Sequence, residues 1–134
     1  MARLVSQVLI QRKFCAVAPD ASVAAAAALM KQAGVGAILV MDGRELVGIF
    51  TERDGLYRVV ADKRDAETTR VDEVMSKDLV TVAPDDDITH ALRLMRDIGF
   101  RHLPVVEDGE VIGIVSTRDI ITAAEFSVLA GSVS

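Results

Sequence analysis

A short polar motif occurs twice in this 134-residue chain, each time directly after an apolar segment. Its first copy is Thr51-Glu52-Arg53-Asp54, and its second copy is Ser116-Thr117-Arg118-Asp119. One carboxylate can accept both hydroxyl protons of a ribose diol, and a neighbouring arginine can pair with phosphate oxygens. The residue types in this motif therefore fit recognition of a nucleotide.

The same spacing has a purely structural interpretation. A hydroxyl residue followed three positions later by an acidic residue is close to a capping box, which needs only to begin a helix. A single copy favours capping. Two copies, each with an arginine before the aspartate and a glycine three residues before the hydroxyl (Gly48 and Gly113), make ligand binding as good an interpretation as capping.

The motif belongs to a longer repeat with a constant offset of 65 positions. Met30 returns as Met95, for example, and Gly34 returns as Gly99. Each copy is too short to close a good core alone, so the two copies are expected to pack together. The predicted boundaries are residues 1–62 for the first copy with an N-terminal helix, 63–70 for a charged linker, and 71–134 for the second copy.

Local signals predict the same elements in both copies. Ser22 and Asp87 are expected N-caps of helices over residues 23–33 and 88–98, which end at Gly34 and Gly99. A further helix begins at the hydroxyl of each motif. Apolar segments predict strands, and Asp42-Gly43 and Asp108-Gly109 predict the hairpin turns; the strands are 14–17, 37–41, 46–50, 103–106 and 111–115. Each copy therefore reads β-α-β-β-α, an α/β (α+β) fold.

A second group of candidate residues occurs in one copy only. Arg101 and His102 precede a strand of the second copy, where they could meet phosphate oxygens, or could simply project into water. The first copy has Gly36 and Ala37 at the matching positions. Any two binding sites are therefore expected to differ in affinity for anions.

Composition excludes several classes of function. A net charge of −5, no tryptophan and one tyrosine disfavour nucleic-acid binding. Charged residues interrupt every apolar run, so no membrane span is expected, and the N-terminus has no long apolar signal core. A single cysteine, Cys15, suits the reducing cytoplasm. The sequence has no metal-ligand spacing and no pair of a nucleophile with a base. We therefore expect neither a metal site nor enzymatic activity.

These motifs together resemble a tandem pair of CBS domains, a family named for cystathionine β-synthase and also called the Bateman module. The resemblance runs from about Leu4 to Glu125 and is carried by four segments: residues 34–37, 48–54, 99–105 and 113–119. It implies pseudo-two-fold symmetry with two clefts between the copies. Members of the family bind adenosine compounds there, namely AMP, ADP, ATP, S-adenosylmethionine and sometimes NAD.

The resemblance also implies roles for individual residues. Asp54 and Asp119 would hold ribose hydroxyls, and Thr51 and Ser116 would contact ribose or phosphate. The groups that would meet phosphate are Arg53, Arg101, His102 and Arg118. Adenine would be flanked by backbone and apolar groups around Val17, Ile38, Val82, Leu103 and Pro104, and Thr81 would add a polar contact.

The function that the resemblance implies is a stand-alone regulatory module that needs no cofactor. It would bind an adenosine nucleotide and signal energy or metabolite state to an effector protein in trans. A homodimer is expected, through the helices that hold Leu29, Met30, Leu94 and Met95. The alternative is a dimerising interaction scaffold with no physiological nucleotide, in which the doubled motif is a capping device.

Overall fold

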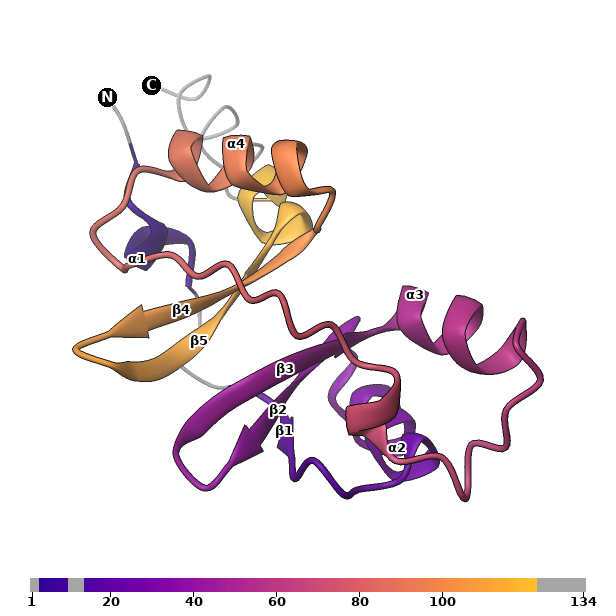
Figure 1. Cartoon of the computed structure of the whole chain (residues 1–134). Helices are drawn as coiled ribbons and strands as arrows, with labels where there is room; N and C mark the ends of the chain where they lie inside the picture. The colour runs from indigo at the N-terminus through magenta and orange to yellow at the C-terminus, as the bar shows by residue number, and fades with distance from the viewer. Residues whose placement is uncertain (1–2, 10–13, 123–134) are drawn as a thin grey trace. The chain divides into compact units, whose positions relative to one another are not determined.

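The computed structural model describes residues 3–9 and 14–122 and divides them into two compact units (Figure 1). The first unit consists of residues 14–79, and the second unit of residues 3–9 together with residues 80–122. Each unit combines helices with a small sheet, so the predicted α/β class is confirmed.

The first unit contains a three-stranded sheet of order β1-β2-β3. The short strand β1 (Ala16–Val17) pairs parallel with β2 (Ala37–Asp42), and β2 pairs antiparallel with β3 (Glu45–Thr51). The helix α2 (Val23–Ala33) connects β1 to β2. After β3 the chain continues as α3 (Glu52–Asp54) and the π-helix η1 (Gly55–Val60), and a 3-10 turn, η2 (Val71–Glu73), follows later.

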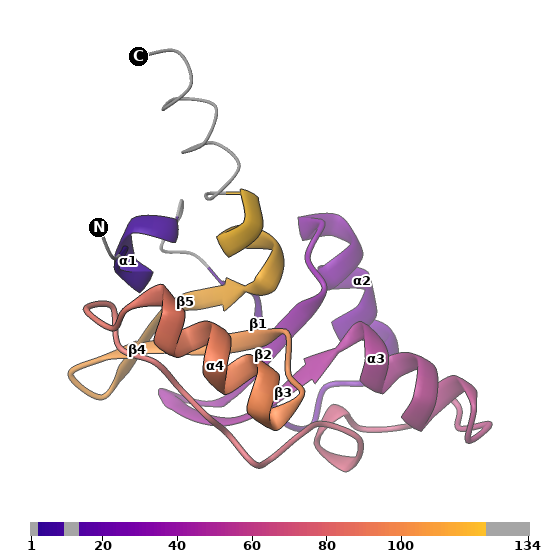
Figure 2. The same ribbon diagram turned by 90° about the horizontal axis from the view of Figure 1, so that it is seen from above.

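The second unit repeats this plan with a smaller sheet. The strands β4 (His102–Glu107) and β5 (Glu110–Ser116) form an antiparallel hairpin, and α4 (Ile88–Ile98) packs on it through Ala91 and Met95 (Figure 2). In place of β1, the second unit has one parallel bridge between Val82 and Val105. The helix α1 (Val5–Val8) completes this unit, and helical turns follow Ser116 at residues 117–122.

The predicted helices α2 and α4 are confirmed to the residue, because their ends carry strong local signals. Ser22 Oγ accepts the N–H of Ala25 at 3.0 Å, and Asp87 Oδ1 accepts the N–H of Thr89 at 2.7 Å. Hydrogen bonding from Thr89 lowers the pKa of the Asp87 carboxyl below its ordinary value. Gly34 and Gly99 adopt left-handed φ values of 68° and 76° and end the two helices.

One hairpin turn lies elsewhere than predicted. Asp42 is the last residue of β2 and pairs with Glu45, so the turn residues are Gly43 and Arg44 rather than Asp42 and Gly43. The first central position needs a positive φ, and Gly43 supplies it with φ 63°. The second turn does lie at Asp108-Gly109.

The two strand glycines accommodate side chains of their own unit. A methyl group added to Gly48 would collide with the Met75 sulfur, whereas one added to Gly113 would lie 3.4 Å from Leu9 Cδ2, which is an ordinary contact. Each glycine also directly follows a bulge residue of its own strand, because the register skips Val47 before Gly48 and Ile112 before Gly113. Packing within the unit therefore explains Gly48 without a ligand, whereas the space around Gly113 would accept a methyl group.

Each unit is completed by a segment that leads into the other repeat, which we call its docked segment. Residues 3–9 are the docked segment of the second unit, and residues 71–79 are that of the first unit. The backbone N–H groups of Val5 and Ser6 donate to Asp86 and Pro84 carbonyls, both at 2.8 Å. The matching bonds of the first unit run from Val71 to Ala21 at 2.7 Å and from Asp72 to Pro19 at 3.2 Å. The contacts therefore group α1 with the second repeat and residues 71–79 with the first. The boundaries 1–62, 63–70 and 71–134 follow the period of the sequence and stay a prediction.

Among the described residues, each unit has an apolar core of its own. Ile38, Val40 and Phe50 anchor the core of the first unit together with Val71 and Val74 of the docked segment. The second core is built from the corresponding elements, with Val5 and Val8 of α1 packed against the helix and hairpin. Its other buried members are Val82, Ala91, Met95, Leu103, Val105, Val115 and Ile120. Burial of the docked segments is what makes each repeat large enough to hold a core.

Gly48→Ala is expected to destabilise the protein, because its new methyl group would force the buried Met75 side chain out of place. Overpacking of this kind costs about 1–3 kcal/mol. The free energy of unfolding, measured by urea denaturation, tests this.

Gly113→Ala is the matched control, since its methyl group meets only an ordinary contact with Leu9. It should cost less than about 1 kcal/mol, within the range of volume changes that a core tolerates. Equal losses for the two variants would contradict the packing explanation.

Candidate functional site

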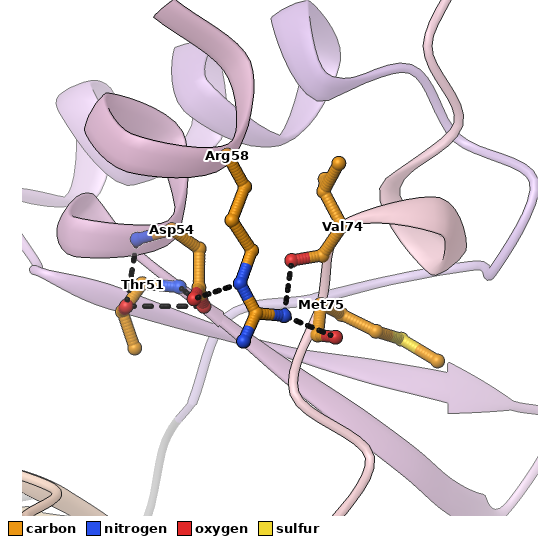
Figure 3. Close-up of polar contacts among 5 residues, drawn as sticks. All are labelled: Thr51, Asp54, Arg58, Val74 and Met75. Atoms are coloured by element: carbon orange, nitrogen blue, oxygen red, sulfur yellow. Dashed lines mark hydrogen bonds and ion pairs between the residues drawn. The ribbon is translucent and has the colours of Figure 1, made fainter. Parts of the chain in front are cut away.

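The first copy of the motif forms a capping box at the junction of β3 and α3 (Figure 3). Asp54 Oδ2 accepts the Thr51 N–H at 3.0 Å and the Thr51 hydroxyl at 3.1 Å. Thr51 Oγ1 in turn accepts the Asp54 N–H at 3.3 Å. One carboxylate oxygen and the hydroxyl proton are therefore already engaged within the motif.

The other carboxylate oxygen of Asp54 faces Arg58. Arg58 Nε lies 3.7 Å from Asp54 Oδ1, and Arg58 Nη1 donates to the carbonyls of Val74 at 3.3 Å and Met75 at 3.2 Å (Figure 3). Asp54 is only 8% exposed. The Arg58 guanidinium thus joins the motif to the part of the docked segment that directly follows η2. It also lies between Asp54 Oδ1 and solvent.

The second copy makes the same capping box without these extra contacts. Ser116 N–H donates to Asp119 Oδ2 at 2.9 Å, and Ser116 Oγ accepts the Asp119 N–H at 3.0 Å. Both residues are half-buried. Within residues 3–9 and 14–122, Asp119 Oδ1 accepts no hydrogen bond and the Ser116 hydroxyl proton goes to no acceptor. The residue that matches Arg58 in sequence is Ala123, which lies outside the described residues.

Strand pairing brings Arg101 and His102 to the same end of the hairpin as this second motif. His102 lies opposite Ser116 in the β4–β5 register. The Thr117 N–H and hydroxyl both donate to the Arg101 carbonyl, at 2.9 and 3.3 Å. The first unit has the equivalent backbone bond, from Glu52 to Gly36 at 3.0 Å, but not the two side chains.

The two motif arginines have different surroundings. Arg53 is exposed and lies over the Tyr57 ring, 5.7 Å from its centroid, in a cation–π contact. Arg118 is exposed, as is the Arg101 side chain, and neither guanidinium forms an ion pair within the part of the chain that the structure describes. The second unit therefore holds two solvent-facing cations, Arg118 within its motif and Arg101 brought beside the motif by strand pairing.

Most of the predicted adenine neighbours are core residues. Ile38 and Leu103 have no exposed surface, and Val82 is 3% exposed. Pro104 is also buried, Val17 is half-buried and Thr81 is exposed. The backbone of Val82 pairs with the Pro104 carbonyl at 3.0 Å, so the residues do lie together in the second unit. Contact with adenine through the buried members would have to use backbone groups.

Sequence reasoning missed Arg58. The signal was present, because an arginine four residues after an aspartate on a helix commonly pairs with it. Within the described ranges, no group of three or more histidine, cysteine, aspartate or glutamate side chains could hold a metal ion. No helix of those ranges is long and apolar enough to cross a membrane.

Two units of this plan, each with a capped hydroxyl-x-Arg-Asp motif, define a paired β-α-β-β-α module. The family described as "CBS domain" matches residues 5–61 and 71–125. The chain therefore belongs to the CBS domain family, and the resemblance found in the sequence is confirmed.

Relatives occur in bacteria and plants. The chain is 39% identical to the CBS domain-containing protein YhcV of Bacillus subtilis over 116 residues, which cover 87% of this chain and 82% of that protein. It is 38% identical to the mitochondrial CBS domain-containing protein CBSX3 of Arabidopsis thaliana over 99 residues, which cover 70% of this chain. That match spans only 48% of the plant protein.

Solved structures share the fold. A putative signal-transduction protein with CBS domains from Burkholderia ambifaria matches with a TM-score of 0.88 and 35% identity, covering 91% of this chain and 93% of that one. A CBS domain protein from Pyrobaculum aerophilum, complexed with AMP, matches with a TM-score of 0.79 and 25% identity. The coverage is 87% of this chain and 89% of that protein.

Arg58→Ala is expected to destabilise the protein. The variant removes two hydrogen bonds to carbonyls of the docked segment and the cation that faces the buried Asp54 carboxylate. Losing partners of buried polar groups costs about 1–3 kcal/mol. Thermal and urea denaturation measure the loss.

Arg96→Ala provides a control for loss of an arginine as such. Its ion pair with Asp97 is solvent-exposed, with side chains 74% and 63% accessible, so its removal should change stability by less than about 1 kcal/mol. If Arg58→Ala were as mild as this control, the contacts of Arg58 would not hold the first unit together.

Proposed function

We propose that this protein is a regulatory module that binds an adenosine nucleotide and reports it to a partner protein. The observation that carries the proposal is the gathering of Arg101, His102, Ser116 and Asp119 at one end of the β4–β5 hairpin, with Arg118 next in sequence. A carboxylate for a diol and cations for a phosphate are the two features that a nucleoside phosphate requires.

The relative complexed with AMP supports the choice of ligand class. AMP, ADP and ATP fit best, since phosphate would engage the exposed guanidinium groups of Arg101 and Arg118. S-adenosylmethionine and NAD also carry a ribose diol and belong in any test. The two copies of the motif need not both take part, because their side chains have different neighbours.

Regulation requires that the ligand bind one state of the module more tightly than another. A nucleotide that engages Asp119 would do so at the start of the helical turns after Ser116, and could bias their position. We propose that an effector protein reads this change. The competing function is an interaction scaffold in which the motif only begins helices, as its capping bonds allow.

Thermal denaturation with AMP, ADP, ATP, S-adenosylmethionine and NAD tests the proposed function. A ligand at about 100 times its Kd adds about 2.7 kcal/mol to stability. For a domain of this size the melting temperature should rise by on the order of 5–15 °C.

Inorganic phosphate at the same concentration is the control, because it can meet the arginines but has no diol for a carboxylate. A saturable rise with an adenosine compound and none with phosphate is the expected result. No rise with any of the five compounds would favour the scaffold instead.

We further propose that the chain forms a homodimer. The residues Leu29, Leu56, Tyr57 and Val60 of the first unit are each more than 40% exposed, which is typical of apolar surface that a partner covers. Met30 and Met95 lie in the cores of their own units and are 6% and 5% exposed, so we expect neighbouring exposed residues to form the dimer contact.

Sedimentation equilibrium should give twice the chain mass. A single chain mass at all concentrations would contradict the dimer.

A further inference from the structure

We propose that the second repeat alone takes the ribose of the ligand, on Asp119, and that Arg58 commits Asp54 to holding the first unit together. This inference rests on the proposed function and names which of the two copies of the motif is the ligand site. It predicts one nucleotide per chain, although the motif occurs twice.

A ribose diol needs free acceptor capacity on the carboxylate that binds it. Each of its two hydroxyls donates one hydrogen bond, and a carboxylate can accept both when its oxygens are accessible. Water must also be able to leave and the diol to enter, so the carboxylate has to be reachable from solvent. The two aspartates differ in both respects.

Asp54 has less free acceptor capacity and less access to solvent than Asp119. Its Oδ2 accepts two hydrogen bonds from Thr51, at 3.0 and 3.1 Å, and its Oδ1 faces Arg58 Nε at 3.7 Å (Figure 3). The residue is 8% exposed. A diol would have to displace Arg58, and Arg58 is also tied to the docked segment.

Displacing Arg58 would leave buried acceptors without this donor. The carbonyls that Arg58 Nη1 contacts belong to Val74 and Met75, which are 2% and 7% exposed. Buried carbonyls that lose a donor are costly, and this cost would be subtracted from any binding free energy at Asp54. Arg58 therefore takes the position beside Asp54 Oδ1 that a ribose hydroxyl would need.

Asp119 meets both requirements. Its Oδ2 accepts a single hydrogen bond, from Ser116 N–H at 2.9 Å, and within the described part of the chain its Oδ1 accepts none. The Ser116 hydroxyl accepts the Asp119 N–H at 3.0 Å, so its own proton can go to a ligand oxygen. Ser116 and Asp119 are half-buried rather than buried.

The distribution of basic side chains favours the second copy as the ligand site as well. Arg101 and His102 lie beside the second motif, where the first unit has Gly36 and Ala37. Arg53 of the first motif lies over Tyr57, whereas Arg118 of the second forms no ion pair or ring contact among the described residues. Diol and phosphate recognition therefore coincide in the second repeat.

Isothermal titration of the full chain with AMP tests this assignment. The expected stoichiometry is one AMP per chain. Asp119→Asn should weaken AMP binding by about tenfold or more, because a charge-assisted acceptor for the diol is lost. Asp54→Asn should change the affinity by less than about twofold, since that carboxylate serves the fold and contacts no ligand.

A second measurement uses the unaltered protein, in case Asp54→Asn does not fold. In ¹H–¹⁵N correlation spectra, AMP should shift the amide signals of Ser116, Thr117 and Asp119, and leave those of Thr51 and Asp54 in place. Two AMP molecules per chain, tenfold weakening by Asp54→Asn, or equal amide shifts in the two motifs would each overturn the inference. Absence of AMP binding by the unaltered protein would instead refute the proposed function, and this inference with it.

Discussion

The aspartate that ends each repeated motif has two oxygens and several groups that compete for them. One oxygen accepts the backbone N–H of the hydroxyl residue three positions earlier, which begins the helix after the strand. This bond fixes the path of the chain at both strand-to-helix junctions and therefore orients everything that follows. The second oxygen has different neighbours in the two copies: Asp54 Oδ1 faces Arg58, and Asp119 Oδ1 accepts no hydrogen bond within the described residues.

Arg58 makes that difference between the repeats, and it does so from within the fold. Its guanidinium reaches Asp54 and also two carbonyls of the segment after η2, so it links the helix of the first motif to a part of the chain 16 and 17 residues away. The second repeat has an alanine at the matching position. Both copies of the motif thus cap a helix, and within the described residues only the aspartate of the first copy also faces an arginine.

Each of the two cores also depends on residues that belong, by the sequence period, to the other repeat. Val5 and Val71 lie at corresponding positions of two segments, and each is fully buried in the unit built from the other repeat. Neither repeat is therefore a complete folding unit by its own sequence period.

Sequence by itself determined the features that depend on near neighbours: the helix limits at Ser22–Gly34 and Asp87–Gly99, the hairpins, the capping motif and the membership of a family. These follow from hydrogen bonds over three or four residues and from apolar periodicity. The first hairpin turn was displaced by one residue because strand pairing, and not the Asp-Gly pair, places the turn. Only the tertiary structure decided that residues 71–79 pack with the first repeat, that Met75 covers Gly48, and that Arg58 faces Asp54. Those outcomes depend on contacts between segments far apart in the chain, and a periodic sequence carries no direct record of which copy a distant segment will contact.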